Sequence, residues 1–229
     1  MVELTGSTQN DLSAKVRSGN SKHGEVLVAE FQSSGRGRLE RSFEAPPQSA
    51  LLFSFFVCPT RDSDWGFLPL IAGLAVSKAI NTKLDSNLKW PNDVLINEKK
   101  VSGLLSEKIN DEGVVIGIGI NVNLTTDDLP VPSATSLALE GWANCDRNEL
   151  LVAVLTNFAN LFDRWNTFDE TLLDEYEATS STIGKKIEVV GADGGRRKTS
   201  AHGLDPSGAL IIDGGQLLSV GDVIHIVTN

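Results

Sequence analysis

The sequence is poor in the residues that hold metals and form disulfides. Its 229 residues include two cysteines, Cys58 and Cys145, and three histidines, His23, His202 and His225, which are scattered along the chain. None of these spacings resembles a metal-ligand motif. We therefore predict no metal site formed by side chains, and we interpret both cysteines as buried small residues.

Long apolar runs and positive charge are also scarce. The longest apolar stretch, residues 50–57, is interrupted by Ser54 and is too short to span a bilayer. The first seven residues lack the basic flank and apolar centre of a secretory signal. The formal net charge is -10, and basic residues gather only at residues 36–41 and 196–198. Without a signal or a long apolar run, we predict a cytoplasmic protein that does not bind a membrane. Because a chain of this net charge repels nucleic acid, we also predict that it does not bind DNA.

The first 183 residues mix helical and strand patterns. Residues 50–57 predict a buried strand, and residues 104–109 and 114–122 flank a strong hairpin signal. Further strands are predicted over residues 25–31, 88–90, 94–96 and 99–101, and helices over residues 10–17, 67–81, 169–179 and from about residue 147.

The pattern changes at Gly184. Five short strand-like runs follow, separated by glycine-rich turns, at residues 186–190, 198–202, 209–212, 216–219 and 223–227. Five strands at this spacing are typical of a small closed β-barrel. We therefore predict two domains, an α+β body over residues 1–183 and a barrel over residues 184–229.

A segment rich in glycine and arginine follows the strand predicted at residues 25–31. It reads QSSGRGRLER from Gln32 to Arg41. Glycines let backbone N–H groups approach a phosphate closely, and arginines bind phosphate through paired hydrogen bonds. Residue types alone leave a phosphate-binding loop and a solvated basic loop equally open.

A second unusual segment, LKWPNDV, places Lys89 beside Trp90 at the start of a tight Pro-Asn-Asp turn. An ammonium group there, partly removed from water, suits a carboxylate that must attack a phosphate. The alternative is a surface lysine beside a core tryptophan, which the residues alone slightly favour.

Two other glycine-rich stretches do not match nucleotide-binding motifs. Residues 117–123, GIGINVN, lack the third glycine of a dinucleotide-binding fingerprint, and no helix is predicted after them. Residues 194–200 lack the Gly-Lys-Ser/Thr ending of a phosphate-binding P-loop. The sequence also has no G-x-S-x-G nucleophile motif of a serine hydrolase.

Taken in order, several segments resemble the catalytic part of biotin–protein ligases. The similar segments are Ser7-Thr8, the glycine/arginine loop of residues 35–38 with Arg41, the signature segment of residues 89–93, the hairpin of residues 100–107, the strand of residues 117–121 and the loop of residues 134–137. Two departures lie in the glycine/arginine loop, where Glu40 replaces the usual glycine and Phe43 a common tryptophan.

The resemblance covers essentially the whole chain and implies a fold. It implies an α+β mixed sheet flanked by helices, similar to class II aminoacyl-tRNA synthetases, with a C-terminal SH3-like β-barrel. The chain begins almost at Ser7-Thr8, which leaves no room for the N-terminal winged helix that some relatives use to bind DNA. We therefore expect the monofunctional form.

The resemblance also implies roles for individual residues. Lys89 and Arg38 would be catalytic. Biotin would be bound by Ser7, Thr8, Gln32, Gly35, Arg36, Lys89 and Gly103. ATP would be bound by Arg38, Arg41, Phe43, Lys89 and Asn121.

The implied reaction consumes biotin and ATP, with Mg²⁺ accompanying the ATP. Biotinyl-5′-AMP would form first, and the biotinyl group would then pass to a lysine of the biotin carboxyl carrier domain of a carboxylase. Two alternatives remain at this stage. One is a lipoate- or octanoate-handling ligase or transferase of the same fold, and the other is a biotin-sensing module without enzymatic activity.

Overall fold

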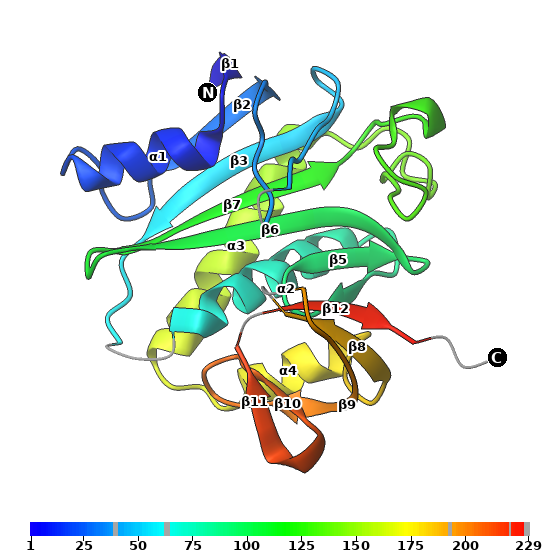
Figure 1. The fold of residues 1–229 in the computed structure, drawn as a ribbon. Coiled ribbons are helices and arrows are strands. Elements are labelled where there is room, and N and C mark those ends of the chain that lie inside the picture. The colour runs from blue at the N-terminus through cyan, green and yellow to red at the C-terminus, as the bar shows by residue number, and fades with distance from the viewer. Residues whose placement is uncertain (39–40, 62–64, 192–193, 220, 227–229) are drawn as a thin grey trace.

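Two β-sheets organise the chain in the computed structural model (Figure 1). The structure describes residues 1–38, 41–61, 65–191, 194–219 and 221–226. Glu40, one of the two departures noted in the glycine/arginine loop, therefore lies outside the described residues.

The larger sheet has seven strands in the order β1-β2-β3-β7-β6-β5-β4. β1 pairs with β2 in parallel, and the remaining neighbours are antiparallel, so the sheet is mixed. Its strands are β1 (Val2–Thr5), β2 (Val26–Gln32), β3 (Ala50–Val57), β4 (Asn87–Lys89), β5 (Asp93–Ile96), β6 (Lys99–Ile109) and β7 (Gly113–Asn121).

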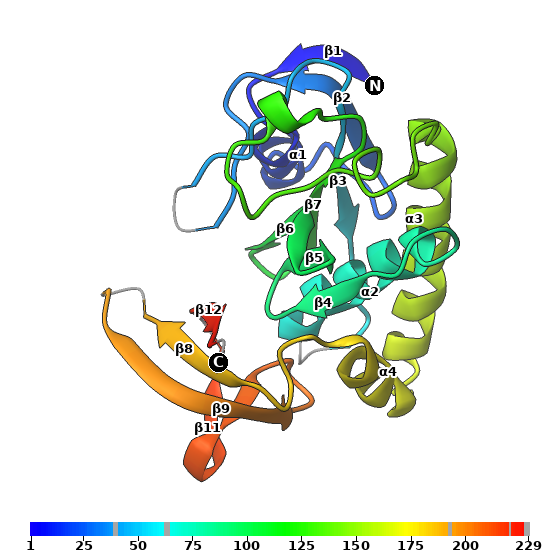
Figure 2. The same ribbon diagram turned by 90° about the vertical axis from the view of Figure 1, so that its right-hand side faces the viewer.

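Helices cover both faces of this sheet (Figure 2). α1 (Thr8–Arg17) packs on one face, where Leu12 and Val16 meet Phe56 of β3. α2 (Leu68–Ile80) and α3 (Arg147–Asn166) pack on the other, against Phe55 and neighbouring side chains. All eight residues of β3 are buried, and successive strand residues point to opposite faces, so both faces of β3 are covered. This explains why the strand is apolar at every position except Ser54.

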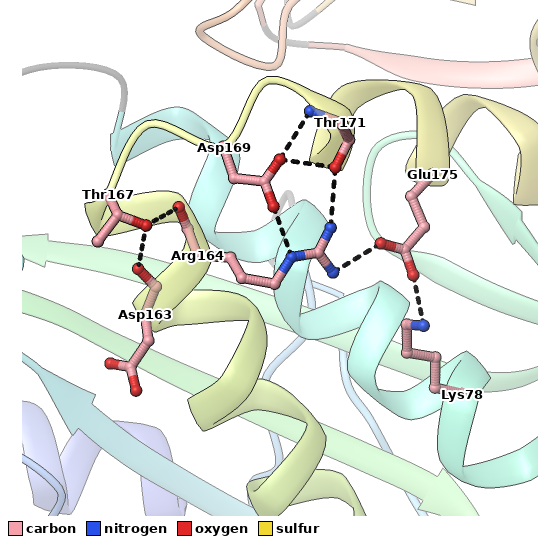
Figure 3. Close-up of polar contacts among 7 residues, drawn as sticks. All are labelled: Lys78, Asp163, Arg164, Thr167, Asp169, Thr171 and Glu175. Carbon is pink, nitrogen blue, oxygen red and sulfur yellow. Dashed lines mark hydrogen bonds and ion pairs between the residues drawn. The ribbon is translucent and has the colours of Figure 1, made fainter.

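An ion-pair network ties the helices together behind the sheet (Figure 3). Arg164 of α3 donates to Asp169 and to Glu175, each at 2.8 Å. Glu175 lies on α4 (Thr171–Thr179) and also pairs with Lys78 of α2. The network therefore fixes the three helices relative to one another, on the side of the sheet away from α1.

The smaller sheet lies at the C-terminal end of the chain, in the order β11-β10-β9-β8-β12. Trp90 is buried between this sheet and the body, where its backbone N–H donates to Thr182 Oγ1 and its indole N–H to the carbonyl of Gly208. The strands are β8 (Lys186–Val190), β9 (Arg196–Leu204), β10 (Leu210–Ile212), β11 (Gln216–Leu218) and β12 (Asp222–His225). Short 3-10 helices span Trp65–Phe67, Thr126–Asp128 and Asp213–Gly215.

The predicted α+β fold, with a mixed sheet flanked by helices, is confirmed, and a five-stranded C-terminal sheet is present where an SH3-like β-barrel was predicted. Closure of this sheet into a barrel stays a prediction. Two details differ from the sequence-based expectation. β1 was not predicted, because most of its short sequence is exposed and lacks a buried face. β6 is one strand rather than two, since Gly103 continues the ladder instead of ending it. None of the helices in the described part of the chain combines the length and apolar composition that a membrane span requires.

Candidate functional site

A cavity opens on the α1 face of the larger sheet, beyond the N-terminus of α1. Its volume is about 700 Å³, including the open mouth. Strands β3, β6 and β7 form its floor, while the glycine/arginine loop, the β4–β5 turn and β12 form its rim. The polar and glycine residues that line it include Ser7, Thr8, Gln9, Gln32, Arg36, Gly37, Arg38, Arg41, Ser42, Ser54, Asn92, Asp93, Lys100, Gly103, Gly117, Gly119 and Asp222.

The floor of the cavity depends on two glycines that lie side by side on adjacent strands. Gly103 of β6 and Gly119 of β7 are register partners, and the ring of Phe43 lies against both. A Cβ on Gly119 would come within 2.6 Å of the Phe43 ring. A Cβ on Gly103 would instead meet the flexible end of Lys100, at 2.9 Å. Absence of a side chain at these positions therefore creates the space that Phe43 and the cavity occupy.

A buried network of hydroxyl and amide groups forms the inner wall. The backbone N–H and Oγ1 of Thr8 donate to Gln32 Oε1, at 2.8 and 3.0 Å. Ser54 Oγ lies 2.9 Å from Thr8 Oγ1 and 3.3 Å from Gln9 Oε1. The hydroxyl groups of Thr8 and Ser54 bring two protons to three oxygen–oxygen contacts, namely Thr8–Gln32, Thr8–Ser54 and Ser54–Gln9. One contact therefore has no proton, which leaves an oxygen able to accept a hydrogen bond from an N–H group of a ligand.

The glycine/arginine loop folds back on itself as it leaves β2. Gly37 donates to the carbonyl of Arg41 at 2.6 Å, and Phe43 to the carbonyl of Gly35 at 2.9 Å. A Cβ on Gly35 would come within 2.2 Å of the Phe43 carbonyl oxygen, so only glycine fits there. Arg36 crosses to α1 and donates to Asn10 at 2.6 Å. Because the chain folds back here, Arg38 and Arg41 lie at the rim of the cavity.

The Pro-Asn-Asp turn supports one of these arginines. Asn92 exchanges backbone and side-chain hydrogen bonds with Leu104 of β6, each at 2.9 Å. Its side-chain oxygen accepts from Arg38 Nη1 at 3.3 Å. The neighbouring Asp93 pairs with Lys100 at 2.6 Å. This turn therefore positions both a guanidinium and an ammonium group at the mouth of the cavity.

Charges of both signs meet on the rim. Asp222 of β12 pairs with Arg41 and lies 3.8 Å from Arg38. Burial lowers the pKa of Arg38, while the charges of Asp222 and Asp93 oppose that shift. Lys89 lies in a hollow that adjoins the cavity and shares Arg41, Asp93 and Asp222 with it. The rim is therefore cationic on the loop side and carries a carboxylate from the C-terminal sheet.

His225 lies near Lys89 at the junction of the two sheets. Its Nε2 is 3.1 Å from Thr182 Oγ1. Burial lowers the pKa of His225 to about 4, Lys89 and Lys185 add to the effect, and Glu98 opposes it. The imidazole is consequently neutral at neutral pH, and it adds no positive charge to the rim.

The structure gathers most of the residues singled out from the sequence. Of these, the residues that line the cavity are Ser7, Thr8, Gln32, Arg36, Arg38, Arg41, Phe43 and Gly103. Gly35 packs beneath Phe43, and Lys89 faces the adjoining hollow. Asn121 is buried and donates to the carbonyl of Thr135 at 2.9 Å, and it is not among the residues that line the cavity.

The sequence analysis gave no role to several other residues of the site. Gln9 and Ser54 complete the inner wall, and Lys100 and Asn92 organise the mouth. A polar residue within an apolar strand, such as Ser54 in ALLFSFFV, is a signal that could have been used. Asp222 carries no such local signal, because it is paired with a residue 181 positions earlier.

No group of three or more histidine, cysteine, aspartate or glutamate side chains that could hold a metal ion occurs among the described residues. The carboxylates at the cavity, Asp93 and Asp222, are paired with Lys100 and with the loop arginines.

Comparison with known proteins gives consistent results. The model of the biotin/lipoate A/B protein ligase family matches residues 1–123. The chain is 36% identical over 236 residues to a biotin--[acetyl-CoA-carboxylase] ligase of Mycobacterium tuberculosis, covering 99% of this chain and 88% of that protein. It is 30% identical over 224 residues to the bifunctional ligase/repressor BirA of Bacillus spizizenii, covering 93% of this chain and 67% of that protein.

Solved structures of similar fold include the biotin protein ligase from Aquifex aeolicus in complex with biotin and ATP. The TM-score is 0.81 with 31% sequence identity, and the match covers 99% of this chain and 97% of that chain. The similarity thus extends through both sheets.

Proposed function

This chain belongs to the biotin/lipoate A/B protein ligase family, and from that membership we infer that it is a biotin–protein ligase. It is an enzyme that activates biotin with ATP and transfers the biotinyl group to a carboxylase. The relatives that carry this activity in their names span the length of the chain, and one neighbouring structure contains both substrates.

The observation that carries this proposal is the contrast between the two ends of the cavity. The inner wall around Thr8 and Ser54 has fewer hydrogen-bond donors than acceptors, and the ureido ring of biotin offers two N–H groups. The rim presents the guanidinium groups of Arg38 and Arg41, which suit a phosphate. A ligand with a ureido ring at one end and a phosphate at the other would satisfy both.

The reaction proceeds in two displacements. A carboxylate oxygen of biotin attacks the α-phosphorus of ATP, and the bond to pyrophosphate breaks, giving biotinyl-5′-AMP. The amine of a lysine then attacks the activated carbonyl carbon, the bond to AMP breaks, and the amine loses its proton as the amide forms. Neither step needs a covalent bond to the enzyme, so catalysis depends on positioning and on stabilising negative charge.

We assign the residues by the part of the substrate that each would meet. Lys89, at the junction of cavity and hollow, would stabilise the carboxylate and the reacting phosphate together with Arg38. Arg41, Phe43 and Asn121 would serve the ATP side. The biotin side would use Ser7, Thr8, Gln32, Gly35, Arg36, Lys89 and Gly103. The position of Lys89 beside Arg41 and Asp93 supports its assignment, since it shares a continuous charged surface with the cavity.

Mg²⁺ would enter with ATP and be held mostly by phosphate oxygens. Before the nucleotide binds, the carboxylates at the cavity, Asp93 and Asp222, are paired with cationic side chains. When bound, the ion would neutralise charge on the phosphates.

The acceptor would be a lysine of the biotin carboxyl carrier domain of the carboxylase. We also propose that the enzyme works in the cytoplasm, where ATP is available. Two unpaired cysteines, Cys58 and Cys145, agree with a reducing compartment.

The test is an ATP–pyrophosphate exchange assay with biotin, lipoate or octanoate as the acid. We expect exchange with biotin only, because the linear acids lack the ureido N–H groups that the inner wall requires. Exchange with lipoate or octanoate but not with biotin would contradict the proposal. Biotin binding without any exchange would identify a sensing module instead.

A further inference from the structure

Asp222 connects the C-terminal sheet to the glycine/arginine loop. It lies on β12 in register with Val190 of β8, and its side chain is only 18% exposed. One carboxylate oxygen pairs with Arg41, and the other lies 3.8 Å from Arg38 Nη1. Both arginines of the loop that we assign to phosphate therefore share a carboxylate from the other sheet.

The surroundings of Asp222 explain why such a contact forms. Arg38 is 19% exposed, and a guanidinium group that loses water is costly unless an anion balances it. Asn92 supplies a neutral acceptor at 3.3 Å, but it brings no negative charge. Lys89 and Arg41 line the same hollow as Asp222 and increase the local positive charge. In the described part of the chain, Asp222 supplies the carboxylate that the two loop arginines share.

An incoming phosphate group and Asp222 have the same chemistry at this place. Both offer anionic oxygens to the fork of an arginine. Arg41 is 64% exposed, so it can turn toward a ligand, whereas Arg38 is held by the Asn92 turn. A phosphate that engages these arginines would therefore have to compete with Asp222 for them.

We propose that Asp222 is a built-in counter-anion, which holds the phosphate-binding arginines before the nucleotide arrives and is displaced by its phosphate groups. This inference rests on the proposed function, since it takes the two arginines as the phosphate site. It adds that nucleotide binding releases the contact between the loop and β12. The C-terminal sheet is then coupled to the cavity through one ion pair.

The first experiment measures ATP binding, without biotin so that no turnover occurs, by calorimetry at low salt. Asp222→Asn keeps the shape of the side chain and removes its charge. We expect it to tighten ATP binding roughly fivefold, as for the loss of one partly exposed competing ion pair. Binding of biotin alone should not change. Unchanged or weaker ATP binding would overturn the proposal, and weaker binding would show that Asp222 helps to hold the nucleotide or its metal ion.

Glu188→Gln is the matched control. Glu188 lies on the neighbouring strand β8, pairs with Arg196 at 2.8 Å and carries the same charge, and no hydrogen bond or ion pair joins it to the described residues of the loop. Its removal should have a smaller effect that disappears at high salt, because only long-range attraction changes. An equal gain in both variants would overturn the specific role of Asp222.

The second experiment uses the wild-type protein and needs no variant. Hydrogen exchange of the paired residues 187–190 and 222–225 should become faster when ATP saturates the protein, because β12 loses its contact with the loop. Unchanged or slower exchange in these strands at saturating ATP would overturn the proposal. Failure of ATP to bind at all without biotin would overturn this inference, whereas the proposed function is decided separately by the exchange assay with biotin.

Discussion

The floor and the rim of the cavity are held together by different interactions. The floor has two glycines in register, with the ring of Phe43 packed on them. The inner wall that adjoins it has buried hydrogen bonds among Thr8, Ser54 and Gln9. The rim uses ion pairs between the glycine/arginine loop, the β4–β5 turn and β12. A floor of this kind selects a ligand by shape and by hydrogen-bond donors, whereas the rim selects it by charge. The two can be perturbed separately.

The largest effect is expected at the rim. Lys89→Ala should lower the rate of biotinyl-5′-AMP formation by about 10²–10³, because a cation that stabilises the reacting phosphate is lost. ATP–pyrophosphate exchange measures this directly, and the unfolding curve should remain close to that of the wild type. Lys99→Ala, on the exposed start of β6, is the control and should retain full activity. A near-normal rate in Lys89→Ala would exclude the role assigned to this lysine.

The next effect distinguishes the two glycines of the floor. Gly119→Ala should weaken biotin binding by roughly 5- to 150-fold, corresponding to the 1–3 kcal/mol of an overpacked site, because its Cβ meets the rigid ring of Phe43. Gly103→Ala should cost less, since the end of Lys100 can move away. Calorimetric titration with biotin compares the two variants. If Gly103→Ala were the more damaging, the ring of Phe43 would not be part of the floor.

Acid should weaken the attachment of β12, which carries the rim carboxylate. The folded-state pKa of His225 is about 4, below the usual 6.5, so the unfolded chain binds more protons between these values. Stability from this group is therefore complete above pH 6.5 and is lost as the pH falls toward 4. We expect a loss of about 1–2 kcal/mol at pH 5, allowing for the partial exposure of the ring.

Urea unfolding at pH 7.5 and pH 5 measures this loss, and His225→Gln should reduce it. His202→Gln serves as the control, because His202 is exposed and its Nε2 contacts Asp213 at 2.7 Å on the surface of the smaller sheet. Equal losses in the wild type and in His225→Gln would assign the acid sensitivity to other groups.

The smallest effect concerns local order in the loop. Residues 33–44 should exchange amide hydrogens more slowly with biotinyl-5′-AMP bound than without it, because its phosphate would bind the loop arginines through paired hydrogen bonds in place of the single carboxylate of Asp222. Floor residues 115–119 should show little change, since their hydrogen bonds are already buried within the sheet. Equal protection of the loop in both states would show that loop order and ligand binding are not coupled.

The sequence predicted the fold well where burial was continuous. The run at residues 50–57 became β3 with the predicted limits, because both of its faces are covered. β1 was missed, since it gains its place only by parallel pairing with β2, which a local pattern does not encode. Gly103 interrupted the strand pattern in the sequence of β6, so two strands were predicted there. The glycine is needed because a side chain at this position would enter the space beside Lys100 and Phe43 at the cavity.

The candidate site was predictable where its residues are neighbours in sequence. The glycine/arginine loop and the Lys89–Asp93 segment were recognised as motifs, and the structure brings both to the cavity or its adjoining hollow. Ser54 and Asp222 were not recognised, because their contacts join segments that are far apart in the chain. Asn121 was expected on the ATP side, and that expectation stays a prediction.

Trp90 has a consequence for how the chain can be divided. Its indole N–H is satisfied by the carbonyl of Gly208, and the ring is only 2% exposed. A truncated chain that ended before the smaller sheet would leave this donor unpaired at an apolar surface, next to the segment that carries Lys89. Such a fragment would tend to aggregate rather than survive as a minimal enzyme. Because the buried core also includes side chains from both sheets, we expect the two sheets to unfold as one cooperative unit.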